Sequence, residues 1–285
     1  MSESPTARRR AQGQALRELR EAAGKSAKDA ADELECSESK IRKIELGDVP
    51  TKRAELDALL KFYDASQEDI DEVKTLAKGA NQRGWWQAYR GAVPRWFRRY
   101  VGLESAAVEI RTFETELIPG LLQTEPYTTA IIDALNPELS GEERDRQVKL
   151  RAERQARLLH DGQTRLLAVV SEGAIRRVVG GPETMREQIR FLLEVRRPAT
   201  LEVQVIPNDA GAHPATGFPF VLLRFPNDVA PTLAYTESLT SAAYHDRQAD
   251  VDTYTLTFDR LRAAALSPSA SAALLEQVVR ELESV

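Results

Sequence analysis

The apolar residues near the start of the chain follow three short helical patterns separated by two tight turns. Gly24 supplies the positive φ that ends the first helix, and Ser26 and Ser37 are placed to cap the second and the third. Faces this narrow can be buried only against one another, so the pattern predicts a cluster of short helices. The apolar stripes comprise Leu16 with Leu19, Ala30 with Ala31 and Leu34, and Ile41 with Ile44.

The run from Leu16 to Gly47 is typical of a helix-turn-helix unit, in which a short connection sets two helices at a steep angle. The second helix then protrudes as a ridge that fits the major groove of DNA. Burial of Ile41 and Ile44 turns the opposite face of that helix outward. The residues predicted to contact DNA lie on this face and at the nearby helix starts: Ser26, Lys28, Ser37, Glu38, Ser39, Lys40, Arg42 and Lys43.

The residue types of the outward face suit duplex DNA. Arg42 and Lys43 can donate to guanine or to phosphate, and Glu38 can accept from cytosine. Polar side chains at helix starts, such as Ser26 and Lys28, suit phosphate contacts that set the register of the protein on DNA. An ordinary solvated helix face is the alternative, and the turn spacing with its flanking helices favours DNA binding.

Residues 10 to about 65, with the run SESKIRKIELG, resemble the Cro/phage-repressor type of helix-turn-helix domain, a five-helix bundle. In that family an arginine of the first helix pairs, largely buried, with a glutamate near the end of the recognition helix. The resemblance implies that Arg20 and Glu45 form this structural ion pair. The chain departs from the family at Ala27, where a DNA-contacting glutamine is usual, and at Glu35, where glycine is usual in the turn. A side chain at positive φ strains the turn by about 1 kcal/mol.

Four segments are predicted from the changes in composition. Thr51 and Ser66 are expected to cap two further helices of the head, and a polar joint follows near residues 78–84. The predicted segments are a flexible basic arm at 1–9, a helix-turn-helix domain at 10–78, a linker at 79–84 and an α+β regulatory and dimerisation domain at 85–285.

The charge of the head is close to neutral. Residues 1–53 carry twelve lysines and arginines against ten acids, and the whole chain has a formal net charge of −5. Such a head is expected to bind random DNA poorly and to depend on specific, dimeric contact. The basic run Arg8–Arg10 either touches phosphates or a minor groove, or forms a solubilising tail.

Composition narrows the class of protein further. With 285 residues and 42% apolar content, the chain can form two domains with cores. It has no apolar run near the ~20 residues that span a bilayer and no apolar signal segment, which predicts a cytoplasmic protein without membrane contact. The single cysteine, Cys36, cannot form an internal disulfide, and a small apolar filler in the turn is its expected role.

An aromatic block opens the second domain. It mixes six large rings with four arginines and contains no acid, a combination that can stack on bases or grip a partner. Packing within the second domain is favoured, because six exposed rings would promote aggregation. The rings are Trp85, Trp86, Tyr89, Trp96, Phe97 and Tyr100.

The remaining pattern mixes strands and helices and predicts an α+β domain with a mostly antiparallel sheet. Strands are expected over 108–115, 165–170, 201–206, 218–225 and 233–236, and helices from about 124 and over 140–160, 172–178, 182–196, 250–264 and 269–282.

Several blocks, among them WWQAY, IPGLLQTEPY, GGPETMREQIRFLLE and LRAAALSPSAS, resemble the uncharacterised C-terminal domain of a large bacterial regulator family. In that family the domain follows a Cro/repressor-type head. Its members are described as antitoxin-like transcriptional regulators, often encoded beside a small partner protein.

Catalysis is not expected. The three histidines, His160, His213 and His245, match no metal-ligand or acid–base motif, and no nucleophile or phosphate-binding motif is present. The sequence therefore predicts no enzyme, no metal and no cofactor. The sequence favours a small-molecule pocket lined by the 207–220 loop over a catalytic site, because a regulator needs a contact that differs between its two states.

Together these features predict a homodimeric transcriptional regulator that binds a palindromic double-stranded DNA operator and responds to an effector or a small protein partner. Two other classes stay open. The head can be a protein-interaction module whose partner is a protein rather than DNA, or the chain can be a metabolic enzyme with a regulatory head.

Overall fold

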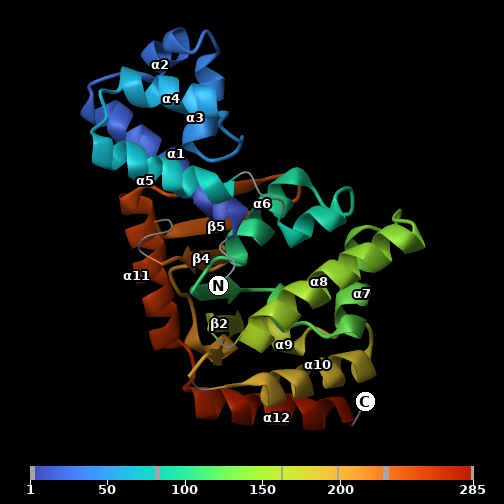
Figure 1. Ribbon diagram of the computed structural model, residues 1–285. Helices are drawn as coiled ribbons and strands as arrows, with labels where there is room; N and C mark the ends of the chain where they lie inside the picture. The colour runs from blue at the N-terminus through green and yellow to red at the C-terminus, as the bar shows by residue number, and fades with distance from the viewer. Residues whose placement is uncertain (1–3, 81–83, 162, 198, 227–230, 284–285) are drawn as a thin grey trace. The chain divides into compact units, whose positions relative to one another are not determined.

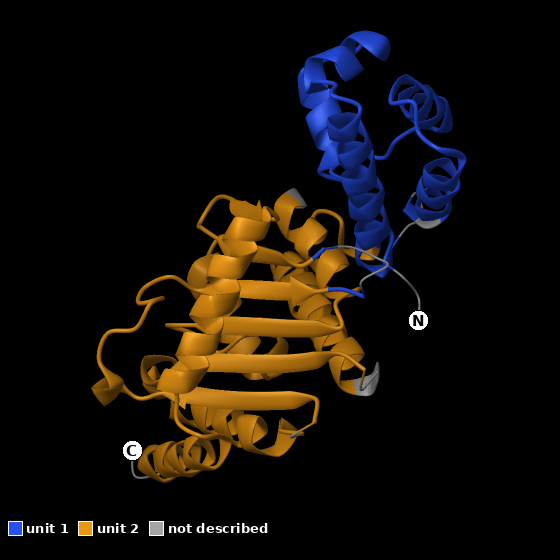
Figure 2. Cartoon of the chain, turned by 90° about the vertical axis from the view of Figure 1, so that its left-hand side faces the viewer, with its two compact units in different colours: residues 1–87, 225–231 blue, residues 88–224, 232–285 orange. Residues whose placement is uncertain are grey.

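The computed structural model describes residues 4–80, 84–161, 163–197, 199–226 and 231–283. The chain divides into two compact units (Figure 2). The helical unit comprises residues 1–87 with 225–231, and the sheet unit comprises 88–224 with 232–285. Among the described helices, none combines the length and the apolar character that a membrane crossing requires.

The described residues of the helical unit form five α-helices (Figure 1): α1 (Pro5–Ala22), α2 (Ala27–Glu33), α3 (Glu38–Glu45), α4 (Arg53–Phe62) and α5 (Gln67–Ala80). Gly24 ends α1 with a φ of 66°, and Ser26 begins α2 in a reciprocal capping box with Asp29. Ser66 and Asp69 make the same exchange at the start of α5. These turn and cap predictions are confirmed.

The start of the helical unit differs from the prediction. The expected flexible arm at 1–9 is wrong from Pro5 onward, because proline suits the first helical turn and α1 begins there. Within α1, the Arg9 guanidinium donates from Nη2 to the Ala80 carbonyl oxygen at 2.9 Å. Residues 1–3 of the predicted arm lie outside the described residues.

Two smaller expectations in the helical unit change as well. Lys52, rather than Thr51, is the N-cap of α4, because Glu55 accepts the Lys52 backbone N–H at 3.0 Å. The expected linker at 79–84 begins inside α5, which continues to Ala80, and its residues 81–83 lie outside the described residues.

The sheet unit contains a six-stranded mixed sheet in the order β3-β2-β1-β4-β5-β6. β2 pairs in parallel with β1 and with β3, and helices connect these strands along the chain. The other three pairs, β1 with β4, β4 with β5 and β5 with β6, are antiparallel. The predicted α+β class with a mostly antiparallel sheet is therefore confirmed. The strands are β1 (Glu109–Glu114), β2 (Arg165–Ser171), β3 (Leu201–Ile206), β4 (Phe220–Arg224), β5 (Leu233–Glu237) and β6 (Ala242–His245).

Helices cover both faces of this sheet. α11 lies across one face (Figure 2), where Phe258 and Leu261 pack with the apolar cluster that contains Phe113 and Leu222. α7 and α8 lie on the other side (Figure 1). The helices are α6 (Arg95–Glu104), α7 (Glu125–Leu135), α8 (Gly141–Asp161), α9 (Glu172–Arg176), α10 (Pro182–Val195), α11 (Gln248–Ala264) and α12 (Pro268–Glu283), with 3₁₀ turns η1 (Trp85–Tyr89), η2 (Gly120–Leu122) and η3 (Asn208–Ala210).

The aromatic block is largely packed. Trp86 and Tyr100 are only 4% and 5% exposed, and the other four rings are half-buried. Within the sheet unit, Tyr100 lies 4.4 Å from Tyr235 between ring centroids, and the Tyr89 hydroxyl donates to Glu153 at 2.8 Å. These contacts agree with the packing interpretation and not with a set of exposed stacking platforms.

Candidate nucleic-acid interface

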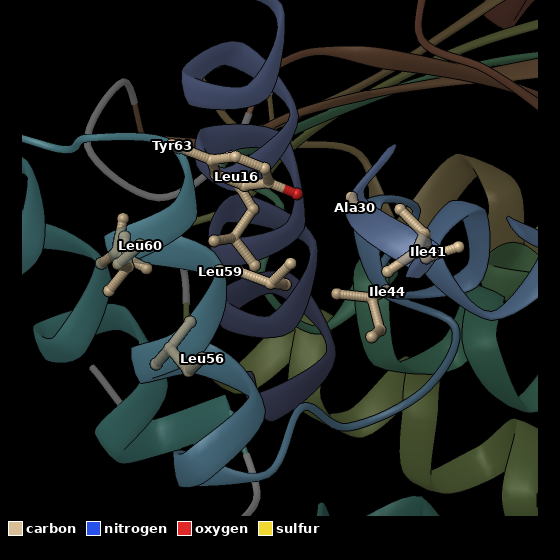
Figure 3. Close-up of a cluster of buried hydrophobic side chains, with 10 residues drawn as sticks. Leu16, Ala30, Ile41, Ile44, Leu56, Leu59, Leu60 and Tyr63 are labelled. Atoms are coloured by element: carbon tan, nitrogen blue, oxygen red, sulfur yellow. The ribbon is translucent and has the colours of Figure 1, made fainter. Parts of the chain in front are cut away.

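The core of the helical unit fixes the orientation of α3. Ile41 and Ile44 are each 1% exposed and pack in one cluster with Leu16, Ala30 and Leu59 (Figure 3). Because these isoleucines lie three residues apart, they define a single inward face of the helix. The predicted inward face of α3 is the observed one.

The opposite face of α3 is open to solvent within the helical unit. Ser39, Arg42 and Lys43 are exposed, and Leu46 at the helix end is 37% exposed. A hydroxyl, a guanidinium and an ammonium thus lie side by side on one helical surface, which we call the α3 outward face. Its side chains can donate hydrogen bonds to base edges and to phosphate oxygens.

The predicted contacts at helix starts also serve as caps. Ser26 accepts the Asp29 backbone N–H at 3.1 Å and donates its hydroxyl proton to the Asp29 carboxylate at 2.7 Å. Ser37 accepts the Lys40 N–H at 3.3 Å. No described residue accepts the Ser37 hydroxyl proton, so of these two serines Ser37 is the better placed to donate to a phosphate. Lys28 is exposed on α2.

Two of the predicted DNA-binding cations already have acidic neighbours. The Arg42 guanidinium pairs with Glu38 one turn earlier, at 2.5 Å between Nη2 and Oε1. The Lys40 ammonium pairs with Glu55 of α4 at 2.7 Å, and this hydrogen bond raises the pKa of Lys40. Glu38 therefore lowers the positive charge of the α3 outward face, while Lys40 is shared with the scaffold.

A groove of about 720 Å³ follows the start of α3. Its cationic lining comes from Arg9, Lys40, Lys43 and Lys52, and Glu55 is the only acid among the described residues that line it. This basic groove extends the α3 outward face beyond the predicted residues. Lys52 was not among the residues predicted to contact DNA. Its place just after the helix-turn-helix run, three residues before Glu55 at a helix start, could have indicated it.

A buried ion pair holds α3 against α1. Arg20 Nε and Glu45 Oε1 lie 2.6 Å apart, and a second hydrogen bond of 3.2 Å joins Nη2 to Oε2. The two side chains are 10% and 8% exposed. Arg20 also donates to the Lys25 carbonyl oxygen at 2.8 Å, and the hydrogen bond with Glu45 raises the pKa of Arg20.

The turn between α2 and α3 contains a non-glycine residue in the left-handed region. Glu35 has a φ of 48°, the conformation that its place in the turn predicts. Cys36, the next residue, is half-buried against the core of the helical unit. It fills space beside the turn, as expected of a small apolar side chain.

The described histidines of the sheet unit are held by separate contacts. The His213 ring packs edge-on against Phe113 at 5.3 Å, and burial lowers the pKa of His213. His245 contacts the Thr236 hydroxyl at 3.2 Å. Within the described parts of the chain, no group of three or more histidine, cysteine or acidic residues could hold a metal ion.

Comparison with protein families gives two matches. Residues 13–73 match a family described as a helix-turn-helix domain, and residues 97–277, more than half of the chain, match a domain of unknown function (DUF5753). The chain belongs to the DUF5753 family. Neither the curated proteins nor the solved structures contain a match to this DUF5753 protein. Its helix-turn-helix match includes Arg20, Glu45 and the whole α3 outward face, and it supports a DNA-binding regulator with an uncharacterised C-terminal domain.

Proposed function

We propose that this protein is a sequence-specific transcriptional regulator of the Cro/phage-repressor type, acting on DNA in the bacterial cytoplasm. The α3 outward face carries the proposal: Ser39, Arg42 and Lys43 project from a helix whose Ile41 and Ile44 are buried, inside the segment that matches a helix-turn-helix domain. Such a ridge can donate to guanine in the major groove while neighbouring cations contact phosphates.

The regulator binds as a homodimer to a palindromic operator. A surplus of two positive charges over residues 1–53 gives weak non-specific attraction, so one head alone binds poorly. Two heads related by a two-fold axis double the specific contacts and require half-sites one or more DNA turns apart.

The sheet unit supplies dimerisation and binds an effector or a small protein partner, and it performs no catalysis. The antitoxin-like role belongs to this proposal, since it rests on the resemblance of the C-terminal blocks to a regulator family whose members are often encoded beside a small protein.

The proposal is tested in two steps. Genomic fragments that bind the purified protein are first selected and sequenced, and a two-fold symmetric site is expected among them. The double variant Arg42→Ala/Lys43→Ala is then compared with Lys61→Ala/Lys78→Ala, which removes the same charge from exposed positions on α4 and α5. The first variant should lose operator binding in a mobility-shift assay, and the second should retain it.

Stability and salt dependence complete this test. The melting temperature should be nearly unchanged in both variants, because the Arg42–Glu38 pair is exposed and contributes less than about 1 kcal/mol. Any residual binding of the first variant should lose about two units of slope in a plot of log affinity against log salt. Operator affinity equal to that of the unaltered protein would contradict the assignment.

A head that binds a protein partner is the second candidate. The neutralising contacts of Glu38 with Arg42 and of Glu55 with Lys40 favour it, because they reduce the positive potential around α3. Two results together would support this candidate over the first. No DNA site is recovered in the selection, and any DNA binding by the protein changes little with salt concentration.

A further inference from the structure

A cavity of about 270 Å³ lies inside the sheet unit, between the sheet and the helices α6, α7 and α8. Its walls are largely apolar and include Phe97, Ile110, Ile131, Leu135 and Leu166. This volume lies just below the roughly 300 Å³ at which the usual range for ligand sites begins, so it suits a compound no larger than an amino acid. The cavity takes Pro219 and Phe220 from the 207–220 segment, but most of its lining comes from elsewhere.

Two carboxyl groups reach this cavity from the C-terminal ends of two strands. Glu114 ends β1 and Glu237 ends β5, and both strands run antiparallel to β4, which lies between them. Continued to Pro219, the two pairing registers put Glu114 and Glu237 in one row across that residue. Side chains in one row point to one face, and two strand spacings separate their backbones by about 10 Å.

The Glu114 carboxyl group has no hydrogen bond or ion pair with any described residue. Its side chain is surrounded by protein and forms part of the cavity wall. Burial and the nearby Glu237 carboxylate raise the pKa of Glu114 to about 8. Glu237 accepts the Tyr235 hydroxyl at 2.9 Å, and burial raises the pKa of Glu237 as well.

A guanidinium group reaches the cavity from the helical side. Arg151 of α8 donates to the Gln123 side-chain oxygen, and no carboxylate of a described residue lies within ion-pair distance of it. Burial lowers the pKa of Arg151 to about 10, which leaves the group charged at neutral pH.

The neighbouring Arg154 is different, because its charge is already matched. Its guanidinium makes two hydrogen bonds of 2.8 Å with Glu104, and both side chains are almost fully buried. The positive group that remains to be satisfied in the cavity is therefore Arg151. Glu114 keeps its proton at neutral pH while the cavity is empty, and it is the carboxyl group that a ligand ammonium would ionise.

We propose that this cavity is the effector site and that it binds a small zwitterion with an apolar body, the class to which apolar α-amino acids belong. The ligand's ammonium group lies against Glu114 and Glu237, its carboxylate against Arg151, and its apolar part against Phe97, Ile131 and Leu135. This inference specifies the effector part of the proposed function.

Each charged group of the zwitterion pairs with one side chain of the cavity that has no oppositely charged partner. A buried charge without a partner is costly, and a ligand that carries only an amine leaves Arg151 unpaired while adding a second positive charge. A ligand that carries only a carboxylate leaves Glu114 without a donor. A second cavity of about 550 Å³ shares Phe97, Leu135 and Arg151 with the first and offers a route for entry.

The test is calorimetric titration of the full-length protein, without DNA, with three compounds that share one carbon skeleton. L-leucine carries both charges, 3-methylbutylamine lacks the carboxylate and 4-methylpentanoate lacks the amine. Leucine is expected to bind at least about tenfold more tightly than either half, since each charged hydrogen bond contributes that much or more. The same comparison is made with a larger apolar side chain, using L-phenylalanine, phenethylamine and 3-phenylpropanoate.

Substitutions locate the site. Glu114→Gln and Arg151→Gln should each weaken binding by at least about tenfold. Two control variants from exposed neighbouring positions, Glu116→Gln and Lys149→Gln, should leave the affinity unchanged. All four variants are first checked for an unaltered far-ultraviolet spectrum and a cooperative melt.

Three results would overturn the inference. They are failure of both amino acids to bind, equal affinity for the amine or the acid alone, and equal loss of affinity in the control variants. Because the titration contains no DNA, failure here leaves the mobility-shift result untouched. Failure of the unaltered protein to bind any operator would contradict the proposed function and would leave the titration result untouched.

Discussion

At the scale of single residues, burial separates ion pairs that stabilise the fold from ion pairs that only adjust surface charge. The Arg20–Glu45 pair is about one-tenth exposed, whereas Arg17 and Glu21 are 38% and 52% exposed on the same helix, α1. Removal of one partner from a buried pair leaves the other charge without compensation. At the surface, water solvates the charge that remains after the same change, so the loss of stability is small.

Glu45→Gln should therefore lower the free energy of unfolding of the helical unit by about 3 to 5 kcal/mol. Glu18→Gln, a control at an exposed position of α1 whose carboxylate accepts a hydrogen bond from Gln14, should change it by less than about 1 kcal/mol. Urea unfolding followed by far-ultraviolet circular dichroism measures both. Similar small losses in the two variants would show that Arg20 finds another partner.

Glu114 makes stability depend on pH. Its carboxyl pKa is raised from 4.5 to about 8, so the folded state binds more protons than the unfolded state between these values. The free energy of unfolding should fall as pH rises through this window, by up to about 1.4 kcal/mol per pH unit from this group. The groups that set this environment are Glu237, Arg151 and the Arg154–Glu104 pair.

Glu114→Gln should flatten this decline, and the variant should be more stable than the unaltered protein at pH 8.5, a pH above the raised pKa of about 8. Thermal unfolding across pH 5 to 9 measures the difference, with Glu116→Gln as the control. Parallel pH profiles for the unaltered protein and Glu114→Gln would mean that Glu114 ionises normally in the fold.

Sequence patterns could predict residues whose role depends on local spacing. Ile41 and Ile44 fix the α3 outward face through helical periodicity alone, and Ser26 and Glu35 follow from turn chemistry. The contact between Lys40 and Glu55 depends on how α3 meets α4, and the cavity groups Glu114 and Arg151 come together only through strand pairing and helix packing. No local pattern contains that information.

At the scale of elements, the crossing of α1 over the end of α3 requires a residue without a side chain. A Cβ atom at Gly13 would lie 2.5 Å from the carbonyl oxygens of Ile44 and Glu45, which belong to the backbone and cannot move away cheaply. In an isolated helix, alanine is favoured over glycine by about 1 kcal/mol. Tertiary packing reverses that preference here.

Gly13→Ala should destabilise the helical unit by about 1 to 3 kcal/mol, the range for overpacked sites. Gly24→Ala should cost about 1 kcal/mol for its positive φ alone, because no atom lies within 4 Å of the added carbon. Urea unfolding ranks the two variants. A stabilised Gly13→Ala variant would contradict the close approach of α1 to α3.

Most helices and strands of the sheet unit were predictable because their apolar patterns are long and bounded by proline or glycine. β3 lies over the predicted residues 201–206, and α10 begins at Pro182 as expected. β6 was not predicted: its four residues, Ala242–His245, lie at an edge of the sheet and none is buried, so they carry no alternating apolar signal.

At the scale of the whole molecule, an acidic chain carries a helix-turn-helix head and a second unit with a largely apolar cavity. The formal net charge is −5, and the helical unit and the sheet unit are compact on their own. If both proposals hold, ligand and operator are linked through the population of conformations. The strength of such a linkage must then be the same from either side.

L-leucine should change the dissociation constant for the selected operator by about 5- to 150-fold, the usual range of allosteric coupling. The operator must change the dissociation constant for leucine by the same factor. Fluorescence anisotropy of labelled operator and calorimetry of leucine with saturating operator measure the two sides. Leucine binding that leaves operator affinity unaltered would show that the cavity does not control the head.

The single thiol of the chain lies half-buried in the turn between α2 and α3. Because Cys36 is unique, the kinetics of its modification by a disulfide reagent provide a footprint of this turn with no engineered label. Slow reaction reports a closed turn, faster reaction reports transient opening, and protection on addition of operator would trace the docking of α3 in the natural polypeptide.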